Sequence, residues 1–370
     1  MKKLFFITLV LILAVTLIAG CAGESGEEEA TSPEEEPAET EEETAEPAED
    51  EPMGPSVNLA FAMYLPDFDK TTQDCVNYLE MIKEATGGTV DYTLYAGGTL
   101  SPAAEELDAV REGLADVAFY PVAYGSGNLP ESFLLEYPGI NFVNGKAASY
   151  TVMDWFSQIQ PEEISDLKLL FALGQGNGCI MTTFPVEKFE DLAGHQIRCG
   201  DSQAPIISAY GAIPTVMVFS EVYEALRNGV VDGFYGLAHA GNAVKLYEVT
   251  DYVVKDPYYF GSYIMVMNQD VWNSLSQEQQ DAITETTTVA FDQFLAEGRD
   301  ADAQIAYDEF EAYGLTVVEF DEENLAKMIG ASGHLQEDYA AELDEQGYNG
   351  SENLALFREL AEKYNAEYGN

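Results

Sequence analysis

A short phrase that occurs twice constrains the fold of this chain more than any other feature. Residues 109–116 read Ala-Val-Arg-Glu-Gly-Leu-Ala-Asp, and residues 225–232 read Ala-Leu-Arg-Asn-Gly-Val-Val-Asp. In each copy we expect a helix to end at the glycine, which readily adopts a left-handed cap conformation, and the aspartate to open a short buried strand. Two such units indicate two similar α/β lobes, with a cleft between them for a small ligand. Chance similarity is the alternative, because helix–glycine–strand junctions are common.

The charge of the chain argues against two classes of partner. Its 66 acidic and 16 basic side chains give a formal net charge of −50 in 370 residues. Nucleic acids and anionic lipid surfaces attract basic proteins, so we expect this chain to bind neither of them electrostatically. The hydrophobic content of 46% is typical of a globular protein, and the length is sufficient for two domains. We interpret the acidic surface as a solvated one suited to saline surroundings, with recruitment of a cationic partner as the alternative.

The N-terminus is interpreted as an export signal followed by a tether. Two lysines precede an apolar run over residues 4–19, which is short for a membrane span and leads into Gly-Cys21. Small residues before a cysteine resemble a bacterial lipoprotein cleavage box. Residues 1–21 are therefore predicted to be a signal peptide with a lipidated Cys21, and an uncleaved anchor is the alternative. Residues 22–56 are acidic and poor in apolar side chains, which predicts a disordered tether.

Three cysteines remain in the predicted mature chain besides Cys21, namely Cys75, Cys179 and Cys199. An odd number cannot pair completely within one chain. Buried free thiols are favoured, and a disulfide between Cys179 and Cys199 is the alternative. No Cys-x-x-Cys motif occurs, so the sequence does not support a zinc or redox site.

Apolar periodicity predicts strands that alternate with helices, which is typical of largely parallel sheets covered by helices. The predicted strands cover residues 57–64, 90–95, 116–120, 167–173, 179–183, 196–199, 215–218, 231–235 and 262–268. The predicted helices cover residues 67–86, 102–114, 146–160, 202–210 and 220–228. Ser220 is expected to cap the last of these. A capping-box pattern at Ser276 opens a further helix to about Tyr313, long enough to lie against both lobes, and Gly298 is expected to bend it.

Arg198 is the residue best suited to hold a ligand. The chain has five arginines, namely Arg111, Arg198, Arg227, Arg299 and Arg358. Arg198 lies where a predicted strand ends at a glycine. Open α/β sheets bind ligands at such carboxyl ends, and an arginine there can hold a carboxylate through two parallel hydrogen bonds. A salt bridge with one of the many acids is the alternative. Arg111 and Arg227 occupy equivalent places in the repeated phrase and are interpreted as structural or solvated.

Signatures of enzymes are missing from the sequence. The three histidines, His195, His239 and His334, are far apart and have no metal-binding spacing. Neither a Gly-x-Ser-x-Gly nor a Gly-x-x-x-x-Gly-Lys motif occurs. We therefore predict no catalytic residue, no metal and no cofactor, and we expect that the chain is not an enzyme.

Four stretches resemble the solute-binding proteins of TRAP transporters, the DctP family of tripartite ATP-independent systems. Phe-Glu-Asp-Leu-Ala-Gly-His-Gln-Ile-Arg at 189–198 resembles the family's DLKGLKIR element. The stretch Phe-Ser-Glu-Val-Tyr-Glu-Ala-Leu at 219–226, with the Gly-Val-Val-Asp-Gly that follows, resembles a second element. Tyr-Glu-Val-Thr at 247–250 resembles a third, and residues 272–280 resemble the start of the family's long helix. The resemblance covers roughly residues 57–330.

The resemblance implies an α/β, two-lobed, periplasmic-binding-protein-like (type II) fold with hinge strands and a long lobe-spanning helix. With the predicted elements it gives four folded segments after the tether. They are residues 57–176 (first lobe), 177–261 (second lobe), 262–313 (return hinge strand and spanning helix) and 314–370 (a C-terminal strand and helices, mostly against the second lobe).

The resemblance also implies a function. Members of the family bind an organic acid and pass it to a membrane permease driven by an ion gradient. Arg198 falls on the family's carboxylate-anchoring arginine, and Phe219 falls on an aromatic residue that packs against the ligand, with core packing as the alternative. A second arginine of many members is Cys179 here, and the family's Gln-Glu-Asn is Phe-Tyr-Gly at 234–236. These departures make the pocket less polar, so we expect a monocarboxylate with an apolar or aromatic body.

Further candidates for contact with the ligand lie mostly at or beyond predicted strand ends. They are Tyr64, Tyr120, Tyr124, Cys179, Tyr235, Gly236, His239 and Tyr258. A buried structural role is the alternative for each of the first three tyrosines. The sequence thus predicts an extracytoplasmic, lipid-anchored receptor that closes its lobes on an organic acid for a TRAP-type importer. The alternatives are the binding component of another importer, a sensor, or an enzyme on the same scaffold.

Overall fold

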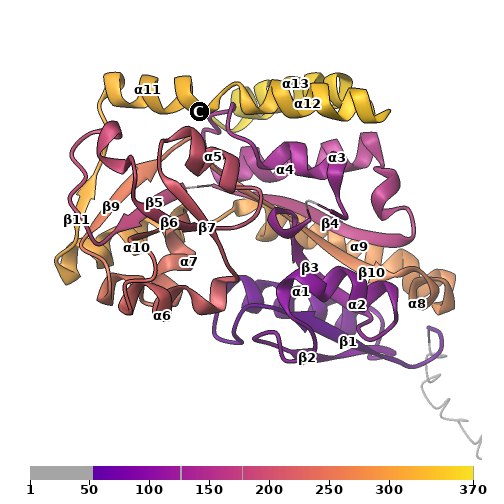
Figure 1. The fold of residues 1–370 in the computed structure, drawn as a ribbon. Helices are drawn as coiled ribbons and strands as arrows, with labels where there is room; N and C mark the ends of the chain where they lie inside the picture. The colour runs from indigo at the N-terminus through magenta and orange to yellow at the C-terminus, as the bar shows by residue number, and fades with distance from the viewer. Residues whose placement is uncertain (1–52, 126, 177, 370) are drawn as a thin grey trace, which may run out of the picture. The chain divides into compact units, whose positions relative to one another are not determined.

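The computed structural model of this chain describes residues 53–125, 127–176 and 178–369. The predicted signal peptide, the lipidation site Cys21 and nearly all of the predicted tether lie outside these residues. In the described part of the chain, no helix is both long and apolar enough to cross a membrane. Figure 1 shows two β-sheets in this part, each flanked by helices.

The two sheets follow the same strand order over five strands, which agrees with the two similar lobes that the repeated phrase predicts. Their strands are β1 (Val57–Met63), β2 (Val90–Tyr95), β3 (Val117–Pro121), β4 (Leu167–Gln175), β5 (Gly178–Thr182), β6 (Gln196–Cys199), β7 (Ile213–Val216), β8 (Gly233–Leu237), β9 (Tyr252–Asp256), β10 (Gly261–Asn268) and β11 (Thr316–Val318). The orders are β2-β1-β3-β10-β4 and β11-β9-β5-β8-β6-β7. In each sheet three parallel strands are followed by one antiparallel strand, β10 in the first and β5 in the second, and then by a strand that runs in the direction of the first three, β4 and β9. The second sheet has β11 as an additional edge strand, parallel to β9. We call each sheet with its covering helices a lobe.

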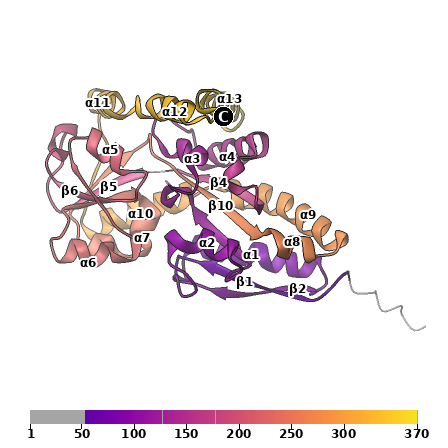
Figure 2. The same ribbon diagram turned by 45° about the vertical axis from the view of Figure 1, so that its right-hand side comes forward.

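Helices cover both faces of each sheet (Figure 2). They are α1 (Lys70–Ala85), α2 (Glu106–Arg111), α3 (Pro130–Phe133), α4 (Gly145–Ile159), α5 (Ala204–Ala209), α6 (Val222–Arg227), α7 (Ala238–Ala243), α8 (Gln269–Ser274), α9 (Gln277–Gln293), α10 (Asp300–Tyr313), α11 (Glu322–Ser332), α12 (Leu335–Gln346) and α13 (Gly350–Tyr368). In the first lobe, α1 and α9 pack on one face and α2, α4 and α13 on the other. In the second lobe, α5 and α11 pack on one face and α6 and α10 on the other.

The glycines of the repeated phrase end their helices as predicted. Gly113 follows α2 and has a φ of 73°, and Gly229 follows α6 and has a φ of 67°. Both values lie in the left-handed region, where a residue with a Cβ atom is strained. No side chain near either glycine restricts the space for a Cβ atom. The backbone conformation alone therefore requires glycine at both positions.

The aspartates of the repeated phrase make matching contacts in the two lobes. The carboxylate of Asp116 accepts the backbone N–H of Ala60 at 2.7 Å, and the N–H of Asp116 donates to the carbonyl of Ala60 at 2.9 Å. Asp232 makes the same two bonds with Gln196, at 2.9 and 2.7 Å. Each aspartate thus pairs with both backbone groups of one residue in the neighbouring parallel strand. The repeated sequence encodes the start of β3 and β8 through these bonds.

The predicted spanning helix is interrupted at the point where bending was expected. Its first part, α9, packs with α1 of the first lobe, and its second part, α10, packs with α7 and β11 of the second lobe. Between them, Gly298 has a φ of 69°. A Cβ atom built on Gly298 would lie 2.6 Å from the Cα atom of Gly145, and the N–H of Gly145 donates to Asp300 at 2.6 Å. The backbones of α4 and the helix junction therefore meet directly.

The C-terminal segment differs from its prediction. Strand β11 and helix α11 pack on the second lobe, but α12 and α13 pack on the first, as Figures 1 and 2 both show. Phe357 and Tyr364 of α13 share an apolar cluster with Trp155 of α4. The indole N–H of Trp155 donates to the carbonyl of Asn353 at 3.1 Å. The expectation that this segment lies mostly against the second lobe is therefore wrong for its last two helices.

One local expectation is corrected, the cap at Ser220, and another is confirmed, the buried free thiols. Helix α6 begins at Val222 after a short 3-10 turn. The side chain of Ser220 does not cap it, contrary to the expectation. Cys75, Cys179 and Cys199 are buried free thiols, so the alternative disulfide does not form. The reason is geometric, because Cys179 and Cys199 belong to the apolar clusters on opposite faces of the second sheet.

A buried acid in the first lobe lacks a compensating group. Glu106, at the start of α2, is fully buried, and neither of its carboxyl oxygens has a hydrogen-bond partner among the described residues. Burial raises the pKa of Glu106 to about 9, because the charged form is poorly solvated there. Glu106 is therefore a neutral acid in the folded chain at neutral pH.

The two cap glycines give a stability prediction. Gly113→Ala and Gly229→Ala should each lower the free energy of unfolding by about 1–2 kcal/mol, because alanine is strained at a left-handed φ. The matched control is Gly330→Ala, inside α11, where a Cβ atom meets nothing. This substitution should raise the free energy of unfolding by about 0.5–1 kcal/mol. Urea unfolding measures all three, and equal effects at the three sites would contradict the conformational explanation.

Glu106 gives a pH prediction. The unfolded chain releases this proton near the ordinary pKa of 4.5, whereas the folded chain keeps it up to about pH 9. The stability associated with Glu106 is therefore complete below pH 4.5 and falls by up to about 1.4 kcal/mol per pH unit between the two values. The glutamine in Glu106→Gln cannot titrate. The free energy of unfolding of this variant, measured relative to that of the parent, should therefore increase as the pH rises through this window.

Urea unfolding at pH 5, 7 and 8.5 provides the measurement for Glu106→Gln. The control is Glu105→Gln, next to it in the chain and exposed. Parallel pH profiles for the parent and Glu106→Gln would show that the carboxyl is not neutral in the folded chain.

Candidate functional site

Arg198 lies on β6 and is fixed by uncharged groups. Its side chain is buried, with 4% of the residue exposed. The Nε and Nη2 atoms donate to the carbonyl of Met217 at 3.1 and 2.7 Å. The rings of Phe219 and Phe234 flank the guanidinium, whose carbon is 5.7 and 5.6 Å from the two ring centroids. Such contacts orient an arginine but leave its charge without an anionic partner.

No ion pair neutralises Arg198 within the described part of the chain. The other four arginines each lie within 3.5 Å of at least one carboxylate. Arg198 lies near none of the described carboxylates at that range, although the chain has 66 acidic residues. The alternative interpretation of Arg198 as a salt-bridge residue is therefore not supported. Its Nη1 amino group has no acceptor among the described residues, so hydrogen-bond donors remain available for a ligand.

Arg198 faces a cleft between the lobes with about 520 Å³ of empty space. The walls come from strand ends of both sheets and from the connection between β9 and β10. The lining residues are Tyr64, Leu65, Pro121, Ala123, Tyr124 and Tyr263 of the first lobe, Arg198, Gly200, Gln203, Phe219, Phe234, Gly236, Leu237 and Ala240 of the second, and Tyr259 of the connection. Arg198 is the only charged residue in this set.

Polar contacts join the lobes around the cleft. The hydroxyl of Tyr124 accepts from Nη2 of Arg198 at 3.4 Å. Gln203 is held at both ends of its amide, because its Oε1 atom accepts the N–H of Gly200 at 2.7 Å and its Nε2 atom donates to the hydroxyl of Tyr259. These side chains are therefore oriented before any ligand arrives.

Glu136 forms a second junction between the lobes. It is buried and accepts the N–H of Ser262 in β10 at 2.8 Å, the hydroxyl of Ser262, and the hydroxyl of Ser202 in the second lobe at 3.4 Å. Burial raises the pKa of Glu136 to about 7, and the bonds from Ser262 and Ser202 oppose that rise. In contrast to Glu106, Glu136 is surrounded by donors.

The structure brings together half of the predicted site residues. Arg198, Phe219, Tyr64, Tyr124 and Gly236 all line the cleft. Tyr120, Cys179, Tyr235, His239 and Tyr258 are not among the lining residues. Tyr120, Cys179 and Tyr235 are fully buried in the apolar clusters of the sheets.

The other two residues outside the cleft have neighbours that line it. His239 lies half-buried in α7, where removal of the imidazole from water and the charge of Arg299 lower its pKa to about 3, and the next residue, Ala240, lines the cleft. Tyr258 lies in the connection between β9 and β10, where Tyr259 takes the lining position.

The predicted set missed several lining residues, among them Phe234, which the sequence alone does not distinguish from Tyr235. Phe234 pairs in register with Arg198 on the neighbouring parallel strand, so both side chains point to the same face. Tyr235 points to the opposite face, where its hydroxyl donates to Asp256 at 2.7 Å. Gln203 and Tyr263 also carry no signal in the sequence, because their positions depend on the loop between β6 and α5 and on the return of β10 to the first sheet.

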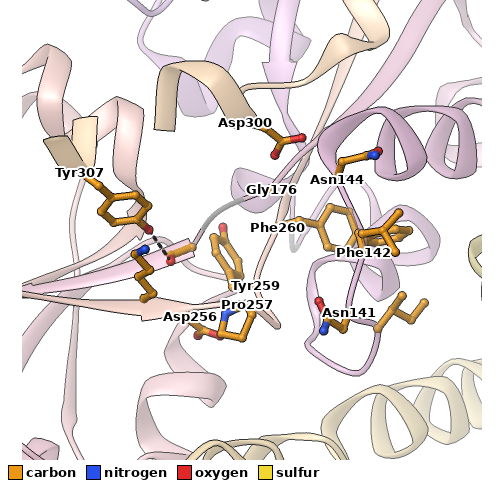
Figure 3. A pocket seen from close by; sticks show the side chains of 14 residues that line it. Asn141, Phe142, Asn144, Gly176, Asp256, Pro257, Tyr259, Phe260, Asp300 and Tyr307 are labelled. Carbon is orange, nitrogen blue, oxygen red and sulfur yellow. Dashed lines mark hydrogen bonds between the residues drawn. The ribbon is translucent and has the colours of Figure 1, made fainter. Parts of the chain in front are cut away.

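A second cavity, with about 590 Å³ of empty space, lies at the segments that connect the lobes (Figure 3). It shares only Tyr259 with the cleft, and none of the predicted site residues lines it. Its one lining cation, Lys255, pairs with Glu319, and the hydroxyl of Tyr307 donates to the carbonyl of Gly178 at 3.4 Å (Figure 3). The cleft at Arg198 is therefore the candidate site.

A family model and one protein sequence show what this chain is similar to. Residues 61–343 match the model described as bacterial extracellular solute-binding protein, family 7 (DctP). A solute-binding protein of Sulfitobacter sp. (strain NAS-14.1) is 27% identical over 289 residues, which cover 75% of this chain and 84% of the relative.

Solved structures show the same two-lobed fold. A TRAP periplasmic solute-binding protein of Bordetella bronchiseptica with bound (R)- and (S)-mandelate has a TM-score of 0.73 and 25% identity, and the match covers 83% of this chain and 99% of that one. A marine metagenome TRAP solute-binding protein specific for aromatic acid ligands, in complex with metahydroxyphenylacetate, has a TM-score of 0.78 and 22% identity, with coverage of 84% and 99%. The second likeness shows the fold alone.

Proposed function

The chain belongs to the bacterial extracellular solute-binding proteins of family 7, and we propose that its ligand is a monocarboxylate with an apolar or aromatic body. Members of this family are TRAP receptors, which bind small organic acids outside the cytoplasm and work with membrane permease subunits. They are receptors and not enzymes. The class of ligand and the residues that hold it are the new part of this proposal.

The observation that carries the proposal is a buried cation without a carboxylate partner. Arg198 faces the cleft between the lobes, and no described acidic side chain pairs with it. A ligand carboxylate accepts charge-assisted hydrogen bonds there, which are shorter and stronger than bonds between neutral groups. Burial strengthens the attraction further, because few water molecules screen it.

The rest of the cleft supports a ligand body without charge. Phe219, Phe234, Leu65 and Leu237 supply apolar surface, and Tyr64, Tyr124, Tyr259 and Tyr263 add rings with a polar tip. A second carboxylate in this cleft would have no cation beside it and would lose its hydration. The receptor of Bordetella bronchiseptica holds mandelate, an acid with one carboxylate and one ring, which agrees with this class.

Capture proceeds through closure of the lobes. Tyr64 and Tyr124 belong to the first lobe and Arg198 and Phe219 to the second, so a ligand between them contacts both. The ligand favours the closed arrangement only by the difference between its affinities for the closed and open states. Residues that touch the ligand from both sides supply that difference.

Arg198→Ala tests the proposed ligand class. We expect the parent to bind at least one of benzoate, phenylacetate and mandelate, with a higher melting temperature in its presence. The variant should lose about two orders of magnitude in affinity, because a carboxylate loses two charge-assisted bonds. Isothermal titration calorimetry with each acid, and with succinate as the dicarboxylate, gives the affinities.

The matched control for Arg198→Ala is Arg227→Ala. Arg227 is exposed and pairs with Glu224 on α6, so its loss should leave the affinity unchanged. Tight binding of succinate by a parent that binds none of the aromatic acids would refute the ligand class. Equal affinities of the parent and Arg198→Ala would refute the role of the guanidinium.

The proposal includes a lipid anchor at Cys21, which rests on the sequence alone. A lipidated cysteine with two or more acyl chains attaches a protein stably to a membrane. In a bacterial host, the parent should incorporate labelled palmitate and sediment with membranes. Cys21→Ser should do neither, and Cys75→Ser, which changes a buried thiol, should behave as the parent. Label in Cys21→Ser, or an unlabelled parent in the soluble fraction, would contradict the anchor.

A further inference from the structure

Phe234 and Gly236 have an unusual spatial relation on β8. They are two positions apart on one strand, so they lie on the same face of the sheet. A Cβ atom built on Gly236 would lie 2.3 Å from Cζ of Phe234 and 3.0 and 3.1 Å from its two Cε atoms. Gly236 is not among the glycines with positive φ. Its requirement is therefore one of space, because the ring of Phe234 lies over its backbone.

The ring of Phe234 in this position forms one wall beside Arg198. Its centroid is 6.0 Å from that of Phe219, with 53° between the ring planes. Together the two rings flank the guanidinium at 5.6 and 5.7 Å. The Nε and Nη2 edge is taken by the carbonyl of Met217. The end formed by Nη1 and Nη2 is left for a ligand, next to the hydroxyl of Tyr124.

Positions 234 and 236 carry no polar side chain on this side of the cleft. Position 236 has no side chain, and position 234 presents only carbon atoms. The ligand part beyond the carboxylate therefore meets aromatic surface on this side, and flat apolar groups pack well against such rings. A ligand with a second charged group would bury it there without a partner, which selects against it.

From these contacts we propose that Phe234 and Gly236 act as one specificity-determining unit, in which Gly236 leaves the space that the Phe234 ring occupies and the ring selects flat acids with a single carboxylate. The inference rests on the proposed function and deepens it. Gly236 is a positioning residue, since it acts on the ligand through the ring. Phe234 is the residue that contacts the ligand.

A double-mutant cycle tests this unit with Phe234→Ala, Gly236→Ala and the double variant. The probes are benzoate, phenylacetate, mandelate and succinate, each titrated calorimetrically into the full chain. Each single variant should bind the best aromatic acid at least tenfold more weakly than the parent does. The ratio of its affinity for that acid to its affinity for succinate should also be smaller than in the parent. In the Phe234→Ala background, Gly236→Ala should add less than twofold, because the ring that it displaces is already absent.

Two controls separate specificity from folding. Phe68→Ala removes a ring that is 70% exposed and should leave all affinities unchanged. Phe234→Leu keeps an apolar side chain without a flat ring, so it should fold as the parent and still lose preference for aromatic acids. If Gly236→Ala does not fold, the test rests on Phe234→Leu and Phe234→Ala. The ratio of the affinity for the best aromatic acid to the affinity for succinate should then be lower in both variants than in the parent.

The outcomes distinguish this inference from the proposed function. A parent that binds no acid overturns both. A parent that binds an aromatic acid through Arg198, with the same preference over succinate in the Phe234 variants, overturns the specificity unit alone. Additive losses in the double variant show that Gly236 does not act through the ring, which also overturns it.

Discussion

The cleft depends on one electrostatic constraint, a buried guanidinium for which no described residue supplies a negative charge. Removing a cation from water costs several kcal/mol unless nearby groups compensate. For Arg198 the Met217 carbonyl and two rings compensate in part. In the function that we propose, the carboxylate of the ligand supplies the missing negative charge when the cleft closes. The apolar lining, the strand ends and the interlobe contacts surround the guanidinium of Arg198.

The acidity of the whole chain acts against this local attraction at long range. A net charge of −50 repels anions, but salt screens the field to about 10 Å at 0.1 M ionic strength. Within the cleft, Arg198 is buried and screening is weaker. The proposed recognition of an acid by Arg198 therefore acts at contact distance and does not need a basic surface.

The sequence predicts the two similar lobes because part of the repeated phrase acts locally. Gly113 and Gly229 end helices by their own backbone conformation, which is a local property. The choice between Phe234 and Tyr235 is different, since two aromatic residues in succession do not reveal which face of a strand is buried against which neighbour. The C-terminal helices were misplaced for a related reason. Their position depends on contacts such as that of Trp155 with a residue far along the chain.

The meeting of Gly298 with Gly145 has a mechanical consequence. Only hydrogen atoms fit between these backbones, so the described contact of α4 with the junction of α9 and α10 consists of packed backbone and of polar contacts such as the bond from the Gly145 N–H to Asp300. In the proposed closure, this bond and that of Glu136 with Ser202 both oppose rotation of one lobe against the other. Ligand affinity includes the work of this rotation. Under the proposed closure, the strength of binding therefore depends also on a junction whose glycines, Gly145 and Gly298, do not line the cleft.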